Sequence, residues 1–310
     1  MRGARITGWG IAMPPEVVTN FDLEDKMDTT DQWIRERTGI GARHVGGMTS
    51  DLAAEAGRQA MKKADATPDS IDMVLLATTS PDQTCPGTAP TVQDELGLDC
   101  GALDIQAACS GWVYGLITAH AFIQMGMNKV LVIGAESLSR ITDYTDRGTG
   151  ILFGDGAGAT VVEACEGPGE LLGWDMGSDG AYSHILYADP GDTLKMDGKE
   201  VFRQAVKAMI RSTNAALDMA GLTPDDIDHV IPHQANIRIV ESAWKKLGFT
   251  LEQTTMVLER TGNTSSASIP LALNDALAHG RIKKGDKVLL LGFGAGMTWA
   301  SAIVDWQAET

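Results

Sequence analysis

The sequence predicts an α/β protein that is built from two similar halves. Apolar, β-branched runs such as DMVLLATT and KVLVIGAE recur between amphipathic helical segments, which is typical of sheets covered by helices on both faces. Two short strings also recur in the same order. TPDSIDMVLL (67–76) resembles TPDDIDHVIP (223–232), and MNKVLVIGA (127–135) resembles KGDKVLLLGFGA (284–295), with offsets of 156 and 158 residues. This spacing favours a duplicated half, and the alternative is a chance similarity of two strand starts.

The expected strands are, in chain order, RITGWGIAMP, DMVLLATT, ALDIQA, KVLVIGAE, GATVVEA, HVIPHQ, TMVLE, KVLLLGFG and SAIVDW. ALDIQA leads through a turn of small residues into a long apolar helix that ends at Gly126. The Gly-rich stretch CEGPGE at 165–170 is the best boundary between halves. We therefore expect an N-terminal half at residues 1–165 and a C-terminal half at 166–310.

Composition and charge exclude several classes of protein. The formal net charge of −16 argues against binding to nucleic acid, because phosphate backbones repel a negative protein. The four cysteines form no CxxC pair, so we expect neither a metal site nor a disulfide framework, and a reducing cytoplasm is the simplest location. The N-terminus and the apolar runs are too short in apolar length for export or for membrane insertion.

Cys109 is the first candidate for chemistry. It lies between the strand ALDIQA and the long apolar helix, in the string QAACSGW. A thiol at the N-terminus of a helix faces unpaired N–H groups, which lower its pKa and favour the nucleophilic thiolate. The alternative is a buried structural cysteine.

His233 and Asn263 are the other candidates, each expected to follow a strand of the second half. His233 stands in VIPHQANIR, just before a helix that should begin near Ala235. An ordinary core or surface histidine is the default interpretation for His233, and a simple Gly-Asn turn is the default for Asn263. The Gly-rich string LGFGAGMTWAS could bring backbone N–H groups close to a substrate oxygen, but no nucleotide-binding motif is present.

Basic residues gather in two helical segments despite the negative total charge. Arg203, Lys207 and Arg211 share one helix face, and Arg238, Lys245 and Lys246 lie in the helix that follows His233. Spacing alone is equally consistent with a solvated face.

Taken together, these segments resemble β-ketoacyl-acyl-carrier-protein synthase III, the initiating condensing enzyme of type II fatty acid synthesis. The matching strings run over nearly the whole chain in the right order: TDQWIRERTGI, DIQAACSGW, TDRGT, GDGAGA, PHQANIRI, RTGNTSSAS and GFGAGMTW.

The resemblance implies a thiolase-like five-layered αβαβα fold with two pseudo-symmetric halves, normally as a homodimer. It also implies that Cys109, His233 and Asn263 form the catalytic triad. The backbone N–H groups of Cys109 and Ala295 would form the oxyanion hole. Thiolases resemble this fold but have a second cysteine near the C-terminus, and elongating ketosynthases use two histidines, so the Cys-His-Asn set favours the type III enzymes.

The resemblance also implies a pair of substrates. An acyl-CoA would donate its acyl group to Cys109, and malonyl-acyl carrier protein would supply the second carbon unit, with no cofactor and no metal. Among the CoA-binding positions, Trp33 and Arg147 would sandwich the adenine, Arg37 would contact a phosphate and Asn236 would bind pantetheine. The acidic carrier protein would dock on four cations, namely Arg203, Arg238, Lys245 and Lys246.

Two features depart from the family pattern and leave the acyl preference open. Cys85 stands where the family often has a bulky Phe that crosses the dimer interface and walls the acyl pocket, and the segment 180–198 looks short. One alternative function is a pathway-specialised relative that makes a pimeloyl or polyketide starter, or transfers the acyl group to oxygen or nitrogen. A non-catalytic partner subunit is the other alternative, although such subunits lose the nucleophile.

Overall fold

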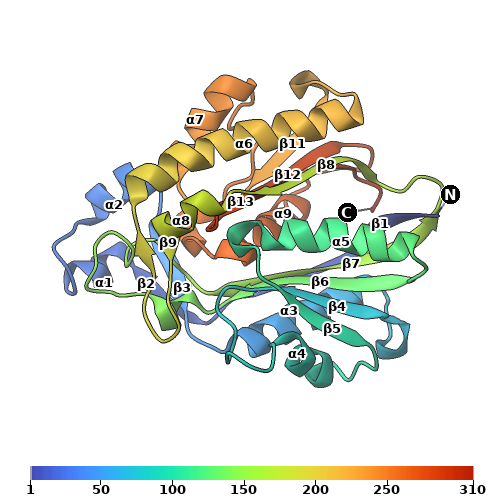
Figure 1. The fold of residues 1–310 in the computed structure, drawn as a ribbon, viewed down its shortest axis with the longest axis horizontal. Coiled ribbons are helices and arrows are strands. Elements are labelled where there is room, and N and C mark those ends of the chain that lie inside the picture. The colour runs from blue at the N-terminus through green and yellow to red at the C-terminus, as the bar shows by residue number, and fades with distance from the viewer. Residues whose placement is uncertain (1, 310) are drawn as a thin grey trace.

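The computed structural model describes residues 2–309 and has five layers (Figure 1). Two sheets enclose a middle layer of helices, and further helices cover the outer face of each sheet. The helices of the first outer layer, the middle layer and the second outer layer are, in turn, α3 (Thr49–Lys63) and α4 (Ala89–Glu95), α5 (Gly111–Gln124) and α9 (Ser268–Ala278), and α6 (Gly198–Ala220) and α7 (Ile237–Leu247).

The two sheets have related topologies. The first sheet has the order β1-β7-β6-β4-β5 and the second the order β11-β12-β13-β8. In each sheet two neighbouring strands run parallel and the strands beyond them run antiparallel. Their bounds are β1 (Arg2–Ala12), β4 (Met73–Ala77), β5 (Gly101–Ile105), β6 (Lys129–Glu136) and β7 (Gly156–Glu166), then β8 (Leu171–Ser178), β11 (His229–Pro232), β12 (Lys287–Gly294) and β13 (Thr298–Asp305).

The internal repeat of the sequence corresponds to matching pairs of strands. Met73 of β4 pairs with Val130 of β6, and His229 of β11 pairs with Val288 of β12. These are the residues that the offsets of 156 and 158 relate. The pairing confirms the two pseudo-symmetric halves. The expected boundary at residue 165 lies one residue before the end of β7, and β8 begins at Leu171.

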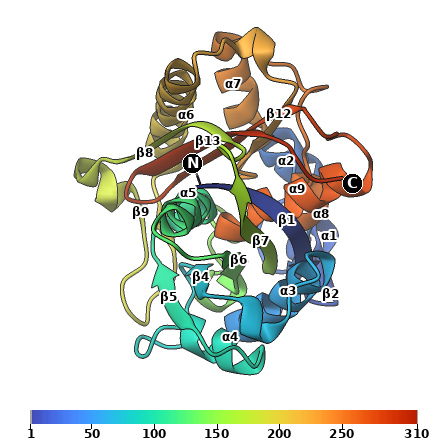
Figure 2. The same ribbon diagram turned by 90° about the vertical axis from the view of Figure 1, so that its right-hand side faces the viewer.

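Smaller elements surround the end of the sheets where the strand-to-helix turns lie. They are β2 (Glu16–Thr19), α1 (Asn20–Glu24), α2 (Asp31–Thr38), β3 (Ala42–Val45), β9 (Leu186–Tyr187), β10 (Lys195–Met196) and α8 (Leu258–Thr261). The two views agree that α1, α2 and β2 lie at one end of the molecule, away from the N-terminus (Figure 2).

One expected strand, TMVLE at 255–259, is absent. Only an isolated bridge between Val230 and Thr254 is formed there, and α8 begins at Leu258. The buried Gln234 explains the difference, because its side-chain oxygen accepts hydrogen bonds from the N–H groups of Val257 and Leu258. These groups therefore bond to a side chain instead of a neighbouring strand. The sequence analysis also missed β8, which contains two glycines and forms the edge of the second sheet.

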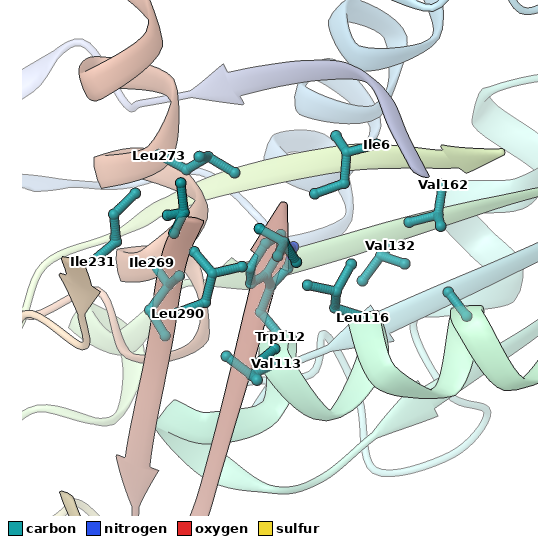
Figure 3. Close-up of a cluster of buried hydrophobic side chains, with 14 of the residues drawn as sticks. Ile6, Trp112, Val113, Leu116, Val132, Val162, Ile231, Ile269, Leu273 and Leu290 are labelled. Atoms are coloured by element: carbon teal, nitrogen blue, oxygen red, sulfur yellow. The ribbon is translucent and has the colours of Figure 1, made fainter. Parts of the chain in front are cut away.

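The main core lies between the two sheets and is organised around α5. Trp112 and Leu116 of this helix are fully buried and pack with Ile6 and Val132 of the first sheet and Leu290 of the second (Figure 3). A helix between two sheets must be apolar on most of its surface, which is why this segment reads as a long apolar helix in the sequence. The core thereby fixes the N-terminus of α5, where Cys109 lies.

No helix within residues 2–309 combines the length and the apolar character needed to cross a membrane.

Glu170 generates a prediction about stability. It lies fully buried between β7 and β8, and its carboxyl accepts a hydrogen bond of 2.8 Å from the N–H of Ile6. Burial raises the pKa of Glu170 from 4.5 to about 8. The native state therefore holds a proton that the unfolded chain releases above its ordinary pKa.

The expected consequence is a free energy of unfolding that decreases as the pH rises from about 5 to 8, by at most about 1.4 kcal/mol per pH unit. Glu170→Gln keeps the shape and stays neutral in both states, so this contribution should disappear and the variant should gain stability relative to the wild type at pH 8. Urea unfolding at several pH values measures it. Glu166→Gln, at an exposed position, is the control. Equal pH slopes for Glu170→Gln and the wild type would contradict the assignment.

Candidate active site

Cys109 lies in a tight turn between β5 and α5. A single 3₁₀ turn, Ala108–Ser110, leads into the helix, and Ala108 adopts a left-handed conformation with φ of +47°. Such a conformation is strained for a residue with a Cβ and is found mostly at functional sites. The end of β12 approaches closely, because a Cβ at Gly294 would lie only 2.5 Å from the Cys109 amide nitrogen. Only glycine permits this approach.

The same turn occurs at the corresponding position of the second half. Ser265 has a φ of +46° and begins the 3₁₀ turn Ser265–Ala267, which leads into α9. The two left-handed residues are 157 residues apart, consistent with the offset of the repeat. Ser266 therefore occupies in the second half the position that Cys109 occupies in the first.

Asn263 lies two residues before this second turn. It follows α8 and Gly262, and not a strand as expected from the sequence. Its N–H donates to the carbonyl of Leu152 at 2.8 Å, and its side-chain oxygen accepts from the N–H of Ser265 at 2.9 Å. Because the oxygen is occupied, the Nδ2 group is the end of the amide that remains available as a donor.

His233 directly follows β11, as expected. Its N–H donates to the carbonyl of Leu291 at 2.7 Å, and its Nδ1 lies 2.7 Å from the hydroxyl of Ser268. The ring of Phe293 packs edge-on against the imidazole at 5.1 Å between centroids. These contacts fix the ring and leave Nε2 as the nitrogen that can serve chemistry. Burial lowers the pKa of His233 to about 3, so the imidazole is neutral at ordinary pH.

The three predicted catalytic residues lie together. Cys109, His233 and Asn263 line one cavity of about 80 Å³, and all three are at least nine-tenths buried. A second cavity of about 360 Å³ lies on the other side of Cys109 and is lined mainly by apolar groups. The two cavities share Cys109, Phe153 and Leu186. Cys109 is thus accessible from both.

The low pKa expected for Cys109 is wrong for the resting structure. Burial raises the pKa of its thiol to about 12, the nearby Ser265 hydroxyl lowers it, and Glu136 raises it further. Position at a helix N-terminus favours the thiolate, but desolvation is the larger effect here. The resting pair is therefore a thiol and a neutral imidazole, and a nucleophile forms only when the thiol loses its proton.

Ala295 follows Gly294 at the end of β12 and lines the second cavity, next to Ala108 and Cys109. The close approach of Gly294 to the Cys109 amide brings the two predicted oxyanion-hole residues to one place. A thioester oxygen bound there would meet backbone donors from both halves of the fold.

Glu136 is a central residue that the sequence analysis missed. It is fully buried at the end of β6, and its Oε2 accepts hydrogen bonds from Thr79 and Ser80. Its Oε1 accepts from the Ser266 hydroxyl at 2.9 Å. The available signal was a carboxylate that ends an otherwise apolar strand, since such a group must find donors when it is buried.

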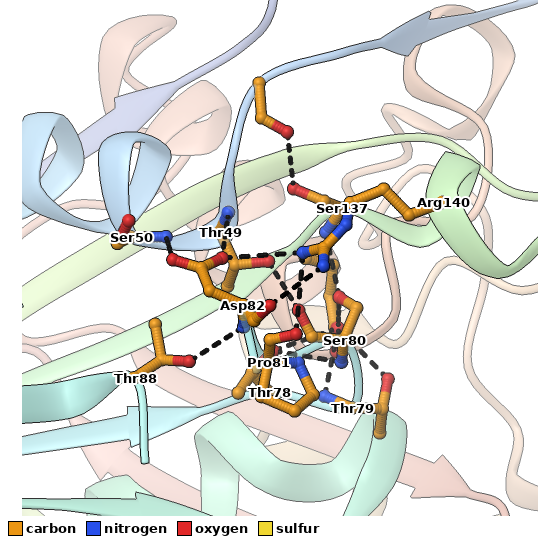
Figure 4. Close-up of polar contacts among 12 residues, drawn as sticks. Thr49, Ser50, Thr78, Thr79, Ser80, Pro81, Asp82, Thr88, Ser137 and Arg140 are labelled. Carbon is orange, nitrogen blue, oxygen red and sulfur yellow. Dashed lines mark hydrogen bonds and ion pairs between the residues drawn. The ribbon is translucent and has the colours of Figure 1, made fainter. Parts of the chain in front are cut away.

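The loop after β4 that provides these donors is itself held rigidly (Figure 4). Asp82 accepts hydrogen bonds from the N–H groups of Thr49 and Ser50 at the start of α3, and the Ser80 hydroxyl accepts from the Ser137 N–H. Because Thr79 lines the second cavity, this network shapes the cavity wall next to Cys109.

The predicted adenine sandwich is closed in this structure. The guanidinium carbon of Arg147 lies 4.6 Å from the centroid of the Trp33 ring, and that of Arg37 lies 4.7 Å from it. This separation is that of a direct cation–π contact and leaves no room for a third flat group between Trp33 and Arg147. Arg147 also donates a hydrogen bond of 2.9 Å to the carbonyl of Asp28.

Asn236 lines the cavity of the triad, but both ends of its side chain are occupied. The amide oxygen caps α7 by accepting from the Arg238 N–H, and the Nδ2 group donates to the carbonyl of Arg37, both at 2.9 Å. Asn236 therefore joins the start of α7 to the end of α2, a role that the sequence analysis did not predict.

The four predicted docking cations are exposed on α6 and α7, which pack against each other. Arg203 forms an ion pair with Glu200 at 2.7 Å. Arg238 and Lys245 are seven residues apart on α7 and share one face, whereas no ion pair within residues 2–309 involves Arg238, Lys245 or Lys246.

The two departures from the family pattern lie in different places. Cys85 is exposed and lines neither cavity, so the prediction that it borders the acyl pocket is not met within a single chain. The segment 180–198, by contrast, contains the hairpin of β9 and β10 and borders both cavities. Its Leu186 lines both, and Leu194 lines the larger one.

Comparison with known proteins gives a consistent result. The family model described as 3-oxoacyl-[acyl-carrier-protein (ACP)] synthase III matches residues 103–180, and the model of its C-terminal part matches residues 217–306. The β-ketoacyl-[acyl-carrier-protein] synthase III of Sinorhizobium medicae is 47% identical over 97% of this chain and 98% of its own length.

Solved structures agree. The 3-oxoacyl-[acyl-carrier-protein] synthase III of Aquifex aeolicus superposes with a TM-score of 0.96 at 40% identity, over 98% of this chain and all of that one. The priming β-ketosynthase of the R1128 polyketide pathway superposes with a TM-score of 0.93 at 35% identity, over 99% of this chain and 97% of that one. On the strength of these matches and of the fold and site described above, this chain belongs to the β-ketoacyl-[acyl-carrier-protein] synthase III family.

Proposed function

We propose that the chain catalyses the initiating condensation of fatty acid synthesis. In this reaction an acyl-CoA and malonyl-acyl carrier protein give 3-oxoacyl-acyl carrier protein, CO2 and CoA. The observation that carries the proposal is the position of Cys109, which lies at the junction of two cavities, one shared with His233 and Asn263 and the other mainly apolar. The enzyme is an acyltransferase whose substrates are thioesters, and we propose that it needs no resident cofactor or metal.

In the first half-reaction Cys109 takes the acyl group. Because both the thiol and the imidazole are neutral at rest, the Nε2 of His233 accepts the thiol proton as sulfur attacks the thioester carbon. The N–H groups of Cys109 and Ala295 stabilise the oxyanion of the tetrahedral intermediate. The CoA thiolate then leaves with that proton, and the acyl chain occupies the apolar cavity.

In the second half-reaction malonyl carrier protein loses CO2. Two donors, the Nδ2 group of Asn263 and the Nε2–H of His233, stabilise the negative charge that develops on its thioester oxygen. The fixed orientation of the Asn263 amide supports this role, since its oxygen is bonded to Ser265. The electron pair released by decarboxylation attacks the acyl carbon on Cys109. The sulfur leaves as a thiolate and is protonated from solvent.

Substrate binding follows from groups near the opening of the triad cavity. The CoA adenine binds on Trp33, which requires Arg147 to move from its present contact with the indole ring. Arg37 is the phosphate contact. Pantetheine passes Asn236, which keeps its capping role and lines the cavity. Competition between the Arg147 side chain and adenine for Trp33 lowers the apparent affinity for CoA.

The malonyl group arrives on an acidic carrier protein that docks on Arg203, Arg238, Lys245 and Lys246. These cations form a local positive surface on a chain with a net charge of −16, and this surface steers a negative partner to the cavity that contains the triad. The absence of ion pairs for three of them within residues 2–309 supports a role in recruiting a partner.

A homodimer is the proposed assembly. The edge of the first sheet is β5, whose outer backbone groups are unpaired in the single chain, and Leu103 on it is 37% exposed. Pairing of this edge with a second copy would satisfy those groups and bury the leucine. A role for Cys85 at the acyl cavity requires such a second copy. We propose a cytoplasmic location, which the four free cysteines support.

The acyl group itself decides between the main proposal and its alternative. The apolar cavity of about 360 Å³ has room for more than an acetyl group, and a family member 35% identical to this chain is a polyketide priming enzyme. A pathway-specialised condensation with a longer or branched starter is therefore the second candidate.

The first prediction tests the nucleophile. Incubation with a panel of acyl-CoA donors should add the mass of one acyl group to the intact protein, and peptide mapping should locate it on Cys109. Cys109→Ala should form no adduct, whereas Cys165→Ala, a matched change at a half-buried cysteine, should form it normally. A wild-type protein that stays unmodified with every donor would exclude the proposed function. The preferred donor also identifies the pathway.

The second prediction separates the two half-reactions. Asn263→Ala should retain acyl-enzyme formation, because Asn263 takes no part in that step. Release of CO2 from malonyl carrier protein should fall by about a hundredfold, as is typical when one oxyanion donor is lost. Rapid-quench mass spectrometry and labelled CO2 measure the two rates. Asn274→Ala on α9 is the control. Equal loss of both rates in Asn263→Ala would contradict the assigned role.

The third prediction tests the docking surface. Lys245→Glu should raise the KM for malonyl carrier protein by about fivefold at low salt, with a smaller effect at high salt, because the interaction is electrostatic. The rate of acylation by acyl-CoA should not change. Lys62→Glu on α3, which covers the other sheet, has the same charge change and should leave both unaltered. An equal KM increase in both variants would refute a local docking site.

A further inference from the structure

Ser268 has a position that the proposed mechanism does not yet use. It is the first residue of α9, has no exposed surface, and its hydroxyl lies 2.7 Å from the Nδ1 of His233. The same hydroxyl lies 2.8 Å from the carbonyl oxygen of Ser265, and the N–H of Gln234 points to it at 3.4 Å. It is therefore the polar partner of the catalytic imidazole on the side away from the cavity.

A hydroxyl carries one hydrogen, and Ser268 has two acceptors for it. If the hydrogen points to Nδ1, the imidazole carries its own hydrogen on Nε2 and offers a donor to the cavity. If it points to the Ser265 carbonyl, the Ser268 oxygen accepts from Nδ1–H, and Nε2 offers a lone pair. The backbone N–H of Ser268 also donates to the Ser265 carbonyl, so this carbonyl has a partner in either arrangement. Neither arrangement leaves a buried polar group without a bond.

The two half-reactions require different states of Nε2. Acylation needs a lone pair on Nε2 that accepts the Cys109 proton, whereas decarboxylation needs an N–H on Nε2 that donates to the developing oxyanion. A histidine held by a fixed acceptor, such as a carboxylate, would be locked in one neutral tautomer. A hydroxyl that can rotate is not locked in this way.

We propose that Ser268 is a positioning residue that allows His233 to adopt both neutral tautomers, one for each half-reaction. This inference rests on the proposed function, because it needs two half-reactions with opposite demands on one nitrogen. The imidazole exchanges its proton with water when the cavity is open, between the departure of CoA and the arrival of the carrier. The Ser268 hydroxyl then rotates from the Ser265 carbonyl to Nδ1.

Loss of the hydroxyl should favour one tautomer. In Ser268→Ala a hydrogen on Nδ1 would lack an acceptor, whereas a bare Nδ1 can still accept from the N–H of Gln234. The Nε2–H tautomer should therefore dominate. Acylation should fall by about tenfold or more, and the reaction of preformed acyl-enzyme with malonyl carrier protein should change by less than about threefold.

The test combines a direct measurement of the tautomer with the two rates. Nitrogen NMR of the labelled histidines, with His233 assigned by His233→Ala, distinguishes protonated from bare ring nitrogens without any need for activity. The wild type should give averaged shifts for both nitrogens, and Ser268→Ala should give those of the Nε2–H form alone. Ser301→Ala, which removes a buried hydroxyl bonded to Ser212 elsewhere, should behave as the wild type.

The outcomes are separable. A wild type with a single tautomer in both the free and the acylated enzyme would overturn the inference, and this measurement does not depend on whether Ser268→Ala folds. Equal loss of both rates in the variant, with unchanged shifts, would show a purely structural role for Ser268 and also overturn it. If no acyl donor modifies Cys109, the proposed function fails on its own evidence, whatever the tautomers of His233.

Discussion

The active site depends on one buried carboxylate that joins the two halves of the fold. Glu136 ends a strand of the first sheet, yet one of its oxygens binds Ser266 at the start of a helix from the second half. The other oxygen binds the loop at Thr79 and Ser80. A carboxylate without exposed surface is stable only when such donors surround it. The relative position of Cys109 and Asn263 is therefore set by hydrogen bonds across the pseudo-twofold axis, in addition to apolar packing.

The same joint supports two strained turns. Ala108 and Ser265 adopt left-handed conformations at equivalent places, and each precedes the N-terminus of a middle-layer helix. The close approach of Gly294 to one turn, and of Gly134 to the carbonyl of Ser266 in the other, holds them against the ends of strands. Duplication thus produced two similar turns. In the present chain one displays a thiol to the cavities, and the other uses its serine to bind Glu136.

Patterns that repeat along the chain predicted the fold well, whereas contacts between distant residues were less accessible. The offset of 156 to 158 residues identified strand pairs that the structure forms. The strand expected at 255–259 failed because a distant side chain, Gln234, takes its N–H groups. Resemblance located the residues of the site, yet the high pKa of Cys109 follows from burial, which no local string reports. Ser268 and Glu136 were missed because their partners are far away in sequence.

The hairpin of β9 and β10 has a consequence for how such an enzyme diverges. The residues that perform chemistry lie at the ends of sheet strands and at the starts of core helices, where most substitutions disturb packing. Leu186 and Leu194, by contrast, line the larger cavity from a short hairpin that belongs to neither main sheet. Insertions, deletions and changes of side-chain size are tolerated far better in such a segment. Selection for a new starter unit can therefore act on this hairpin while the catalytic geometry is inherited unchanged.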